Sequence, residues 1–346
     1  MTKTILLTGA SGVVGQALLQ QLTDTTVICL TRRQTVRGAN VIAIPGDVAQ
    51  PHLGLNEALF HSLARRVDAI VHSAAITDFT RPIDELRRSN VDGVRHILAF
   101  AKAANVPLIH VSTAFIHARS GYALNNYETS KLEAEQVIQA SGVPTVIVRP
   151  SIVLGDSQTG AITQFQGVHR IFRMFIKELL PVVPGANGSY IDYVPQDSVA
   201  AVIQALLAYK VSEGEYWLTA GEAAIRYEVL LDVLIDHAST IIGRQLARPK
   251  VMKPDTFDRL VRPVFLPAFP QRLQRMFEEA LDFTKYMNMV EAFPSSYDAL
   301  VREFGIAPLP SVEASLRHSV EYIIAQNKGL RRSSEMVTQE KEGVTA

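Results

Sequence analysis

Tyr127 and Lys131 are four residues apart in the segment Asn-Asn-Tyr-Glu-Thr-Ser-Lys. On a helix this spacing places the phenol and the ammonium on one face, where the positive charge is expected to lower the pKa of the phenol. Thr113 follows an apolar run upstream, and its hydroxyl is predicted to hold a carbonyl oxygen beside Tyr127. Hydride transfer to a carbonyl leaves an oxyanion that needs such donors. An isolated Tyr-x-x-x-Lys pair is also common on ordinary helix surfaces, so the prediction depends on its context.

A glycine pattern near the N-terminus supplies that context. Gly9, Gly12 and Gly15 follow a strand-like run and open a helix-like one. Glycine lets the backbone turn sharply and approach a pyrophosphate, whose charge then lies at the N-terminus of the helix. A structural turn is the other interpretation of a bare glycine triplet. In this order along the chain, the loop predicts a nicotinamide dinucleotide cofactor.

Two arginines, Arg32 and Arg33, come directly after the second predicted strand. An acidic residue here would bind the ribose hydroxyls of NAD, whereas arginine suits the 2′-phosphate of NADP. The alternative is a pair of solvated arginines on a loop. Because neither Asp nor Glu occurs between Asp24 and Asp47, the sequence favours NADPH/NADP+, with Arg32 as the better ligand. Asp47 is expected to accept a hydrogen bond from the adenine amino group.

Small residues follow the fourth predicted strand in His72-Ser-Ala-Ala, and they let the cofactor lie against the backbone. The residues assigned to the cofactor are Gly9, Ser11, Gly12, Val13, Val14, Gly15, Arg32, Arg33, Asp47, Val48, Ser73, Ala74, Ala75, Tyr127, Lys131, Pro150 and Ile152. The histidines do not show His-x-x-x-His or similar spacing, so no metal site is predicted.

Short apolar runs alternate with helix-like stretches through the first half of the chain. The predicted strands cover residues 4–7, 26–31, 41–44, 68–72, 107–112 and 144–148, and the predicted helices cover 13–22, 53–65, 85–104 and 127–140. Strands rich in Val and Ile with little alternation indicate a parallel sheet that is covered on both faces. The fold class is therefore α/β: a doubly wound parallel Rossmann sheet with a smaller, mostly helical C-terminal substrate lobe.

The regular alternation of strand-like and helix-like segments ends after Arg149-Pro150. The second half predicts an amphipathic helix over 162–180, strands over 189–194 and 215–219, a helix over 197–209, and helical pieces from Tyr227 onward. The predicted domains are an NADP-binding domain over 1–154, to which 189–220 return, a substrate lobe over 155–188 and 221–326, and a disordered tail over 327–346. The apolar stripe of 162–180 either packs as core or lines an acyl pocket. Segment 257–276 is a packed cap, a mobile lid or a membrane-surface segment.

Bulk composition excludes several classes of function. The 34 basic and 34 acidic residues balance, so no nucleic-acid partner is expected. The single Cys29 offers no disulfide framework and no thiolate metal cluster, which suits the cytosol. No window reaches the roughly 18 uninterrupted apolar residues of a membrane span, and the N-terminus lacks the features of a signal peptide. We expect a cytoplasmic enzyme, and composition leaves open whether it is a homodimer.

Together these residues resemble an extended short-chain dehydrogenase/reductase, from Thr4 through at least Thr219. Within that superfamily the chain is most similar to the thioester-reductase and fatty acyl-CoA reductase branch, of the male-sterility type. The segments that carry the resemblance are residues 46–55, His72-Ser-Ala-Ala, Val111-Ser-Thr-Ala-Phe, residues 149–160 and residues 193–200. The resemblance implies Thr113, Tyr127 and Lys131 as the catalytic trio and Asn90 as a residue that helps to order the site.

The resemblance also implies a reaction, the NADPH-dependent reduction of an acyl thioester to an aldehyde and then, in some members, to the alcohol. Coenzyme A or a carrier protein would hold the acyl group. The sequence shows no adenylation or carrier domain before the reductase, so the thioester is expected to come from elsewhere. One alternative is an NADP-dependent ketone/alcohol or nucleotide-sugar oxidoreductase or epimerase on the same fold. Another is a sensor or scaffold that binds NADP without turnover, which the intact trio argues against.

Overall fold

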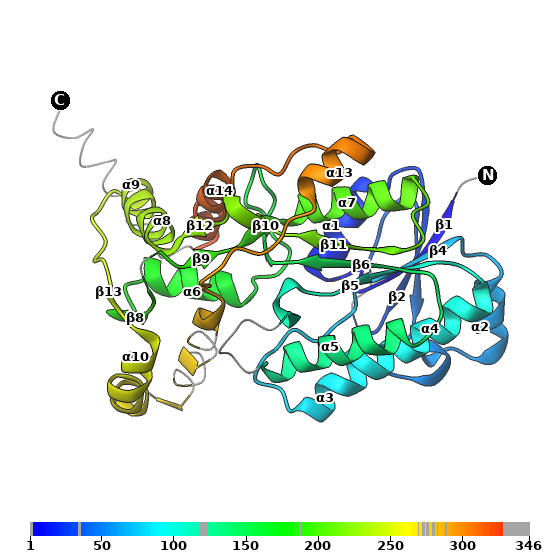
Figure 1. Ribbon diagram of the computed structural model, residues 1–346, viewed down its shortest axis with the longest axis horizontal. Helices are drawn as coiled ribbons and strands as arrows, with labels where there is room; N and C mark the ends of the chain where they lie inside the picture. The colour runs from blue at the N-terminus through cyan, green and yellow to red at the C-terminus, as the bar shows by residue number, and fades with distance from the viewer. Residues whose placement is uncertain are drawn as a thin grey trace. The chain divides into compact units, whose positions relative to one another are not determined.

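Figure 1 shows the computed structural model of the chain, which divides into two compact units. The first, here called the sheet unit, comprises Met1–Val153, Gln196–Thr219 and Pro294–Leu309. The second, the helical unit, comprises Leu154–Pro195, Ala220–Phe293 and Pro310–Ala346. The structure describes residues 3–327 except 34, 35, 118–123, 187, 269, 272, 273, 275, 276, 279, 280, 282 and 288.

The sheet unit is built on a seven-stranded sheet in which each described pairing is parallel. Its strands are β1 (Thr4–Thr8), β2 (Thr26–Thr31), β3 (Val41–Pro45), β4 (Ala69–His72), β5 (Leu108–Val111), β6 (Thr145–Pro150) and β11 (Gly214–Leu218). The spatial order is β11-β6-β5-β4-β1-β2-β3. The chain winds outward from β1 in both directions, so a topological switch point lies between β1 and β4. The doubly wound parallel sheet predicted from the sequence is confirmed.

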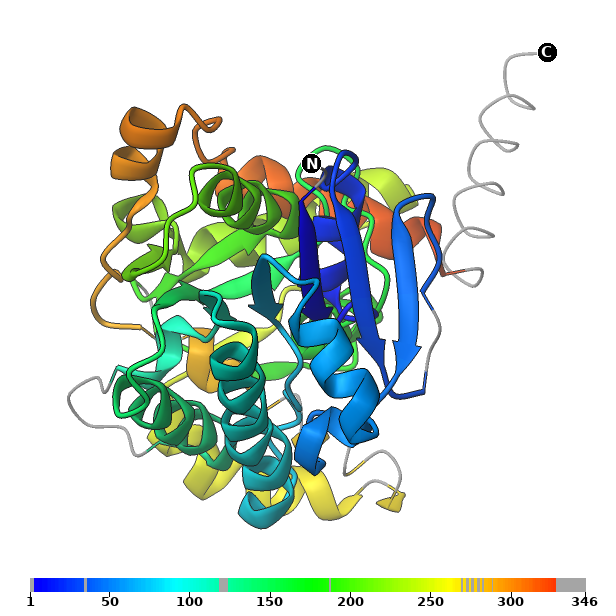
Figure 2. The same cartoon turned by 90° about the vertical axis from the view of Figure 1, so that its right-hand side faces the viewer.

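Helices cover both faces of this sheet, as Figure 1 shows. One layer contains α1 (Val13–Gln21), α7 (Gln196–Ala208) and α13 (Tyr297–Phe304), and the other contains α2 (Glu57–Ala64), α3 (Ile83–Arg87), α4 (Gly93–Ala104) and α5 (Asn126–Gln139). The turned view of Figure 2 again shows α4 and α5 side by side. Successive side chains of a strand point to opposite faces of the sheet, and the helices on each face bury the apolar ones.

Local sequence explains where the two helices nearest the site begin and end. Apolar residues recur in α4 at helical spacing, and those that pack into the core cluster with the strands are Val94, Ile97, Leu98, Phe100 and Ala101. Asn105 ends α4 with a φ of 54°, a conformation that asparagine tolerates better than most residues. α5 begins with a capping box, in which Asn125 and Glu128 each accept from the other's backbone amide at 2.9 Å.

The helical unit consists of short elements. They are α6 (Gly167–Ile176), β8 (Val182–Pro184), β9 (Tyr190–Ile191), β10 (Tyr193–Pro195), β12 (Ile225–Arg226), α8 (Tyr227–Asp232), α9 (Ala238–Ile242), β13 (Lys250–Met252), α10 (Pro254–Leu260), α11 (Arg262–Phe265) and α14 (Val312–Ala325). A π-helical turn over Val233–His237 joins α8 to α9. β7 (Ile152–Leu154) spans the boundary between the two units. Single 3₁₀ turns occur at Pro51–Gly54, Ala114–Ile116, Gly221–Ala223, Leu266–Ala268 and Thr284–Met287.

The second half of the chain differs in several details from its sequence-based prediction. The helix predicted over 162–180 is α6, which is shorter because Glu178 adopts a positive φ of 56° and Pro181 follows. The strand predicted over 189–194 is divided at Asp192, whose buried carboxylate accepts from the amides of Ala220 and Gly221. A strand, β13, pairs with β8 in a region predicted to be helical.

The sheet unit and the helical unit also divide the chain differently from the predicted domains. Residues 294–309, predicted for the substrate lobe, belong to the sheet unit. The edge strand β11 explains this, because the Trp217 amide donates to Ser296 Oγ at 2.9 Å and Ser295 Oγ donates to the Thr219 carbonyl at 2.7 Å. An edge strand leaves backbone groups unpaired, and this later segment supplies their partners. Much of the predicted segment 257–276, and the tail from residue 328, lie outside the described residues.

Candidate active site

The glycine loop lies between β1 and α1, at the switch point of the sheet. Gly9 has a φ of +74°, and a Cβ there would lie 2.6 Å from the Ala74 amide nitrogen. A Cβ at Gly15 would lie 2.2 Å from the carbonyl oxygen of Gly9. Because only glycine fits at these two positions, the loop brings bare backbone to the N-terminus of α1, where free amides favour an anion. This cradle fits the pyrophosphate of a dinucleotide.

The loop after β4 packs directly against the glycine loop. The Ser73 amide donates to the Thr8 carbonyl at 3.2 Å, and the Ala74 amide donates to Thr8 Oγ1 at 3.3 Å. The structure therefore brings together two sets of predicted cofactor residues that are more than sixty positions apart in the sequence, since Thr8 and Ala74 are separated by 66. Val13 and Val14 are buried in the first turn of α1, and Ser11 and Ala75 are partly exposed.

The two residues predicted for the adenosine end of the cofactor form an ion pair with each other. Arg32 Nη1 lies 3.8 Å from Asp47 Oδ2, with side chains 47% and 27% exposed. Asp47 Oδ1 also accepts from the Ala49 amide at 3.0 Å. Arg33 is exposed, and Val48 is buried against Gly93. The sequence located these side chains correctly at neighbouring strand ends but did not predict that the guanidinium already has a carboxylate partner.

Thr113 and Tyr127 meet where β5 ends. Thr113 is buried, accepts from the Phe115 amide at 3.4 Å, and hydrogen-bonds to the Tyr127 hydroxyl. Burial raises the pKa of the Tyr127 phenol above its usual value, the Glu128 carboxylate raises it further, and the Thr113 hydrogen bond acts in the opposite direction. The sequence predicted a lowered pKa from the neighbouring ammonium. That expectation is wrong for this structure, because desolvation of the phenol dominates.

Lys131 is buried one helical turn after Tyr127, with 2% of its surface exposed. Its Nζ donates to the Val111 carbonyl at 2.9 Å and lies 3.1 Å from His110 Nε2. Burial lowers the pKa of Lys131 to about 8, and the Glu135 carboxylate opposes that shift. The amine is therefore mostly charged near neutral pH. An ammonium has three N–H donors, so these two contacts leave one for a cofactor ribose.

Asn90 links the loop after β4 to α5. It lies in a π-helical turn, Arg88–Asp92, inside the stretch predicted as one helix over 85–104. Its Oδ1 accepts from the Ile76 amide at 2.8 Å, while its Nδ2 donates to the Ile76 carbonyl and to Ser130 Oγ, each at 3.0 Å. π-turns often mark functional sites because they redirect one side chain. Here the turn places the Asn90 amide between the two segments that carry the predicted site.

Sequence reasoning missed a buried ion cluster behind the trio. Arg149, in β6, is 1% exposed and donates to both carboxylate oxygens of Glu135 and to Glu215. Glu135 follows Lys131 by four residues, and this i, i+4 repeat of Tyr127 to Lys131 was a signal that could have identified it. Pro150 ends β6 and Ile152 begins β7, and their roles toward the cofactor stay predictions.

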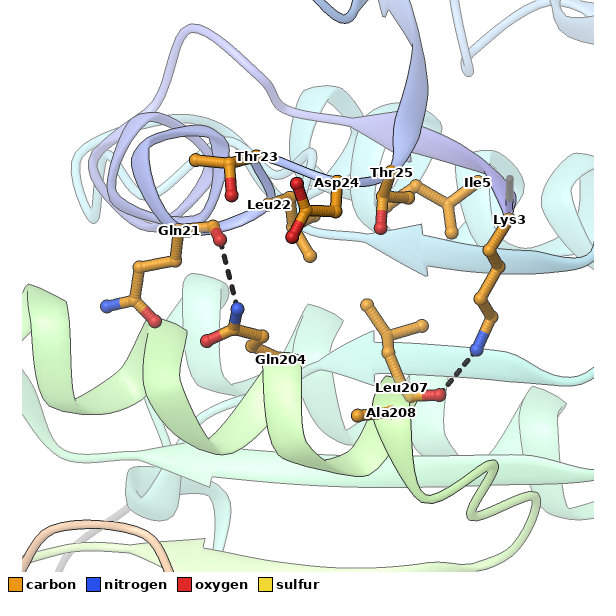
Figure 3. Close-up of a pocket in the computed structure, with 10 residues that line it drawn as sticks. All are labelled: Lys3, Ile5, Gln21, Leu22, Thr23, Asp24, Thr25, Gln204, Leu207 and Ala208. Atoms are coloured by element: carbon orange, nitrogen blue, oxygen red, sulfur yellow. Dashed lines mark hydrogen bonds between the residues drawn. The ribbon is translucent and has the colours of Figure 1, made fainter. Parts of the chain in front are cut away.

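A small cavity of about 130 Å³ lies at the amino ends of β1 and β2, far along these strands from the glycine loop. Figure 3 shows two hydrogen bonds between its lining residues: Lys3 Nζ donates to the Leu207 carbonyl, and Gln204 Nε2 donates to the Gln21 carbonyl at 2.9 Å. None of the predicted site residues lines this cavity. It is therefore separate from the candidate active site.

Two further observations concern the described residues alone. They contain no cluster of three or more His, Cys, Asp and Glu side chains with the geometry to hold a metal ion. Each of their helices is too short or too polar to cross a bilayer.

The chain is similar to known proteins in both sequence and fold. A family model described as "Male sterility protein" matches residues 34–125 and 117–203. A linear gramicidin synthase of Brevibacillus parabrevis is 32% identical over 236 residues, which are 56% of this chain and 5% of that protein. The chain thus spans a small fraction of the length of this relative.

Two solved structures share the fold. The terminal R domain from the myxalamid PKS-NRPS biosynthetic pathway has a TM-score of 0.76 at 24% identity, covering 94% of this chain and 91% of that one. A thiolation-reductase di-domain from an archaeal non-ribosomal peptide synthetase has a TM-score of 0.68 at 19% identity, covering 95% and 76%. The chain belongs to the male sterility branch of the extended short-chain dehydrogenases/reductases, an NAD(P)-binding family of oxidoreductases.

Proposed function

We propose that this chain is an NADPH-dependent reductase of acyl thioesters, which produces an aldehyde and, with a second reduction, the alcohol. The observation that carries the proposal is the meeting of Thr113, Tyr127 and Lys131 at the end of β5, in the same unit as the glycine cradle. A cofactor-binding scaffold without turnover has no need of a half-buried phenol beside a buried ammonium at this place.

The chain's own groups suit the charge that develops during reduction. NADPH, when bound, supplies the hydride for the thioester carbonyl carbon. The hydroxyls of Thr113 and Tyr127 stabilise the resulting oxyanion, and Tyr127 donates its proton to give the hemithioacetal. The raised pKa of Tyr127 keeps the phenol protonated, as a proton donor must be before the reaction. Collapse of the hemithioacetal passes its hydroxyl proton to the departing sulfur, re-forms the carbonyl and breaks the C–S bond, which releases the thiol. A proton from solvent restores the Tyr127 phenol.

Cofactor choice follows from the ends of β2 and β3. Arg32 offers a planar, permanently charged donor that suits a 2′-phosphate, and the nearest carboxylate, Asp47, lies across from it at 3.8 Å. The phosphate would replace Asp47 as a partner of the guanidinium. We therefore assign NADPH, rather than NADH, as the reductant.

The proposal of a tethered substrate is supported by the names of similar proteins. One similar structure is described as a thiolation-reductase di-domain, and another as a terminal R domain. A thiolation domain carries its acyl group as a thioester, so an acyl-carrier protein or coenzyme A is the proposed carrier here. From the composition of the sequence we also propose a cytoplasmic location, while the sequence leaves the oligomeric state open.

A coupled assay tests the proposal. The protein is incubated with NADPH and an acyl-CoA or acyl-carrier thioester, while nicotinamide absorbance and free thiol are followed together. We expect one thiol to be released for each NADPH that is oxidised in the first reduction, and no reaction with the matching free acid. Tyr127→Phe should lose both signals. Oxidation of NADPH by simple ketones, with no thioester consumed, would instead assign the chain to the ketone/alcohol reductases of the same fold. Turnover of a nucleotide sugar would assign it to the epimerases.

A further inference from the structure

We propose that His110 is a positioning residue for Lys131, an inference that rests on the proposed function of the trio. The two side chains are almost wholly buried, at 1% and 2% exposed, and Lys131 Nζ lies 3.1 Å from His110 Nε2. His110 lies in β5, the strand that leads to Thr113. The structure gives its ring nitrogen a direct contact with the group that acts on Tyr127.

The contact fixes the protonation of the imidazole. An ammonium can only donate, so His110 Nε2 accepts and the ring is neutral with its proton on Nδ1. Burial and the neighbouring Lys131 charge hold the pKa of His110 well below its usual range, which agrees with a neutral ring. Nδ1 has no hydrogen-bond partner among the residues that the structure describes. The imidazole therefore serves as an acceptor toward Lys131.

Both acceptors of Lys131 come from β5, the strand that leads to Thr113. The Val111 carbonyl is one, and His110 Nε2, from the preceding residue, is the other. A single carbonyl would leave the long lysine side chain free to swing about one bond. Two acceptors fix the Nζ position and leave one N–H for the cofactor ribose. The same strand end thus sets the place of both the Thr113 hydroxyl and the ammonium.

The His110 ring is itself held from the side of the glycine loop. It stacks on His72, with ring centroids 5.4 Å apart and planes 28° from parallel. His72 Nδ1 lies 2.7 Å from Thr8 Oγ1, which also accepts from the Ala74 amide. A buried stack therefore runs from the strand that precedes the glycine loop to the lysine. It keeps the ammonium in register with the loop that binds the cofactor phosphates.

Matched substitutions of His110 distinguish the loss of its hydrogen-bond acceptor from the loss of its packing. His110→Phe keeps an aromatic ring for the stack but removes the acceptor. His110→Gln places an amide oxygen near the position of Nε2, whereas His110→Asn, shorter by one methylene, does not reach it. His72→Asn is the control, since its amide oxygen can still meet Thr8 and it does not touch Lys131. Circular dichroism and thermal melting establish which variants fold, and the Gln and Asn pair carries the test if the Phe variant does not.

The expected results concern turnover, cofactor affinity and pH. His110→Phe and His110→Asn should lower kcat by about tenfold to a hundredfold, the range for one hydrogen bond to a charged group. They should also move the alkaline fall of kcat/KM to lower pH, because the charged lysine has lost an acceptor. His110→Gln should recover most of both effects. His72→Asn removes the stacking ring but leaves both acceptors of Lys131 in place, so it should lower kcat less than His110→Phe does. The other charged or titratable groups around Lys131, namely Tyr127, Glu128, Glu135, Arg149 and His72, are unchanged in the His110 variants.

NADPH binding alone distinguishes failure of this inference from failure of the proposed function. Fluorescence titration across pH needs no acyl substrate, so it reports on Lys131 even if the native protein reduces no thioester. Weaker NADPH binding above pH 7 in His110→Phe, restored by His110→Gln, supports positioning of the ammonium. Equal losses in the Phe, Asn and Gln variants with an unshifted pH profile would show that His110 only packs. Native behaviour of a folded His110→Phe would overturn the inference outright.

Discussion

The Arg149 guanidinium donates two hydrogen bonds to the Glu135 carboxylate, from Nε to Oε1 at 3.0 Å and from Nη2 to Oε2 at 2.6 Å. Both side chains are at most 4% exposed. The third contact of Arg149, to Glu215 at 2.7 Å, reaches a carboxylate that is 50% exposed. One arginine thus has a buried and a solvated partner. The buried one also lies on the Lys131 face of α5 and favours the charged form of that lysine.

These two carboxylates form a matched pair for a stability test. Glu135→Ala should lower the free energy of unfolding by about 3 kcal/mol or more, because it leaves a buried guanidinium with one exposed partner. Glu215→Ala should lower it by no more than about 1 kcal/mol, as for an exposed ion pair. Urea denaturation of both variants measures the difference. Equal effects of the two substitutions would show that burial does not decide the strength of this cluster.

Cofactor preference should respond to both partners of the Arg32–Asp47 pair. Arg32→Ala should weaken NADPH binding by roughly tenfold to a hundredfold through the loss of charge-assisted hydrogen bonds, and leave NADH almost unaffected. Asp47→Asn should favour NADPH by roughly twofold to fivefold, since it removes the carboxylate that competes with the 2′-phosphate. Fluorescence titration with both nucleotides measures these changes. Tighter binding of NADH than of NADPH by the native protein would refute the assignment.

Tyr127→Phe should remove turnover selectively. The lost hydroxyl acts in the transition state, so kcat should fall by roughly 10² to 10⁴ while the Kd for NADPH changes little. Lys131→Ala should impair both quantities, because the ammonium serves the phenol and the ribose. Steady-state rates and binding titrations are measured on the same preparations. Near-native turnover by Tyr127→Phe would eliminate the proposed role of the phenol.

Reductase activity should decline as the pH rises through about 8. Burial lowers the pKa of Lys131 to about 8, so the folded enzyme loses this charge well before an exposed lysine would. The neutral amine has one donor fewer and no longer stabilises charge near Tyr127. A profile of kcat/KM against pH, with protein folding checked at each pH, measures the midpoint. A profile that stays flat to pH 9.5 would contradict the requirement for a charged lysine.

We expect the buried His169 to make the stability of the helical unit sensitive to acid. It is fully buried in α6, and neither ring nitrogen has a partner among the described residues. Burial lowers the pKa of His169 from its usual 6.5 to about 4, so between these values the unfolded chain binds a proton that the folded chain does not. Stability attributable to this residue is therefore present above pH 6.5 and is lost as the pH falls toward 4.

His169→Phe removes the imidazole that takes up this proton in the unfolded chain. Between pH 7 and pH 4 the variant should lose less unfolding free energy than the native protein, by on the order of 3 kcal/mol. Urea denaturation at several pH values measures the two slopes. Parallel slopes would show that other groups cause the acid sensitivity.

The sequence by itself determined the parts of this protein that depend on local pattern. Apolar runs of strand length, helical spacing in 85–104 and the glycines at 9, 12 and 15 predicted the parallel sheet and the loop at its switch point. Each strand predicted in the first half is present within a residue or two of its bounds. These features are visible in a linear chain because periodicity and backbone freedom act between near neighbours.

Tertiary structure decided which groups meet and how charged they are. The pKa of Tyr127 rises rather than falls because the surrounding protein removes water from much of the phenol, and that desolvation depends on residues from other elements. Arg149 meets Glu135 and Glu215 across 14 and 66 residues, and Thr8 meets His72 across 64. Side chains so far apart in sequence leave no periodic signal. Their contacts and their desolvation are properties of the packed chain, because both depend on which distant surfaces exclude water together.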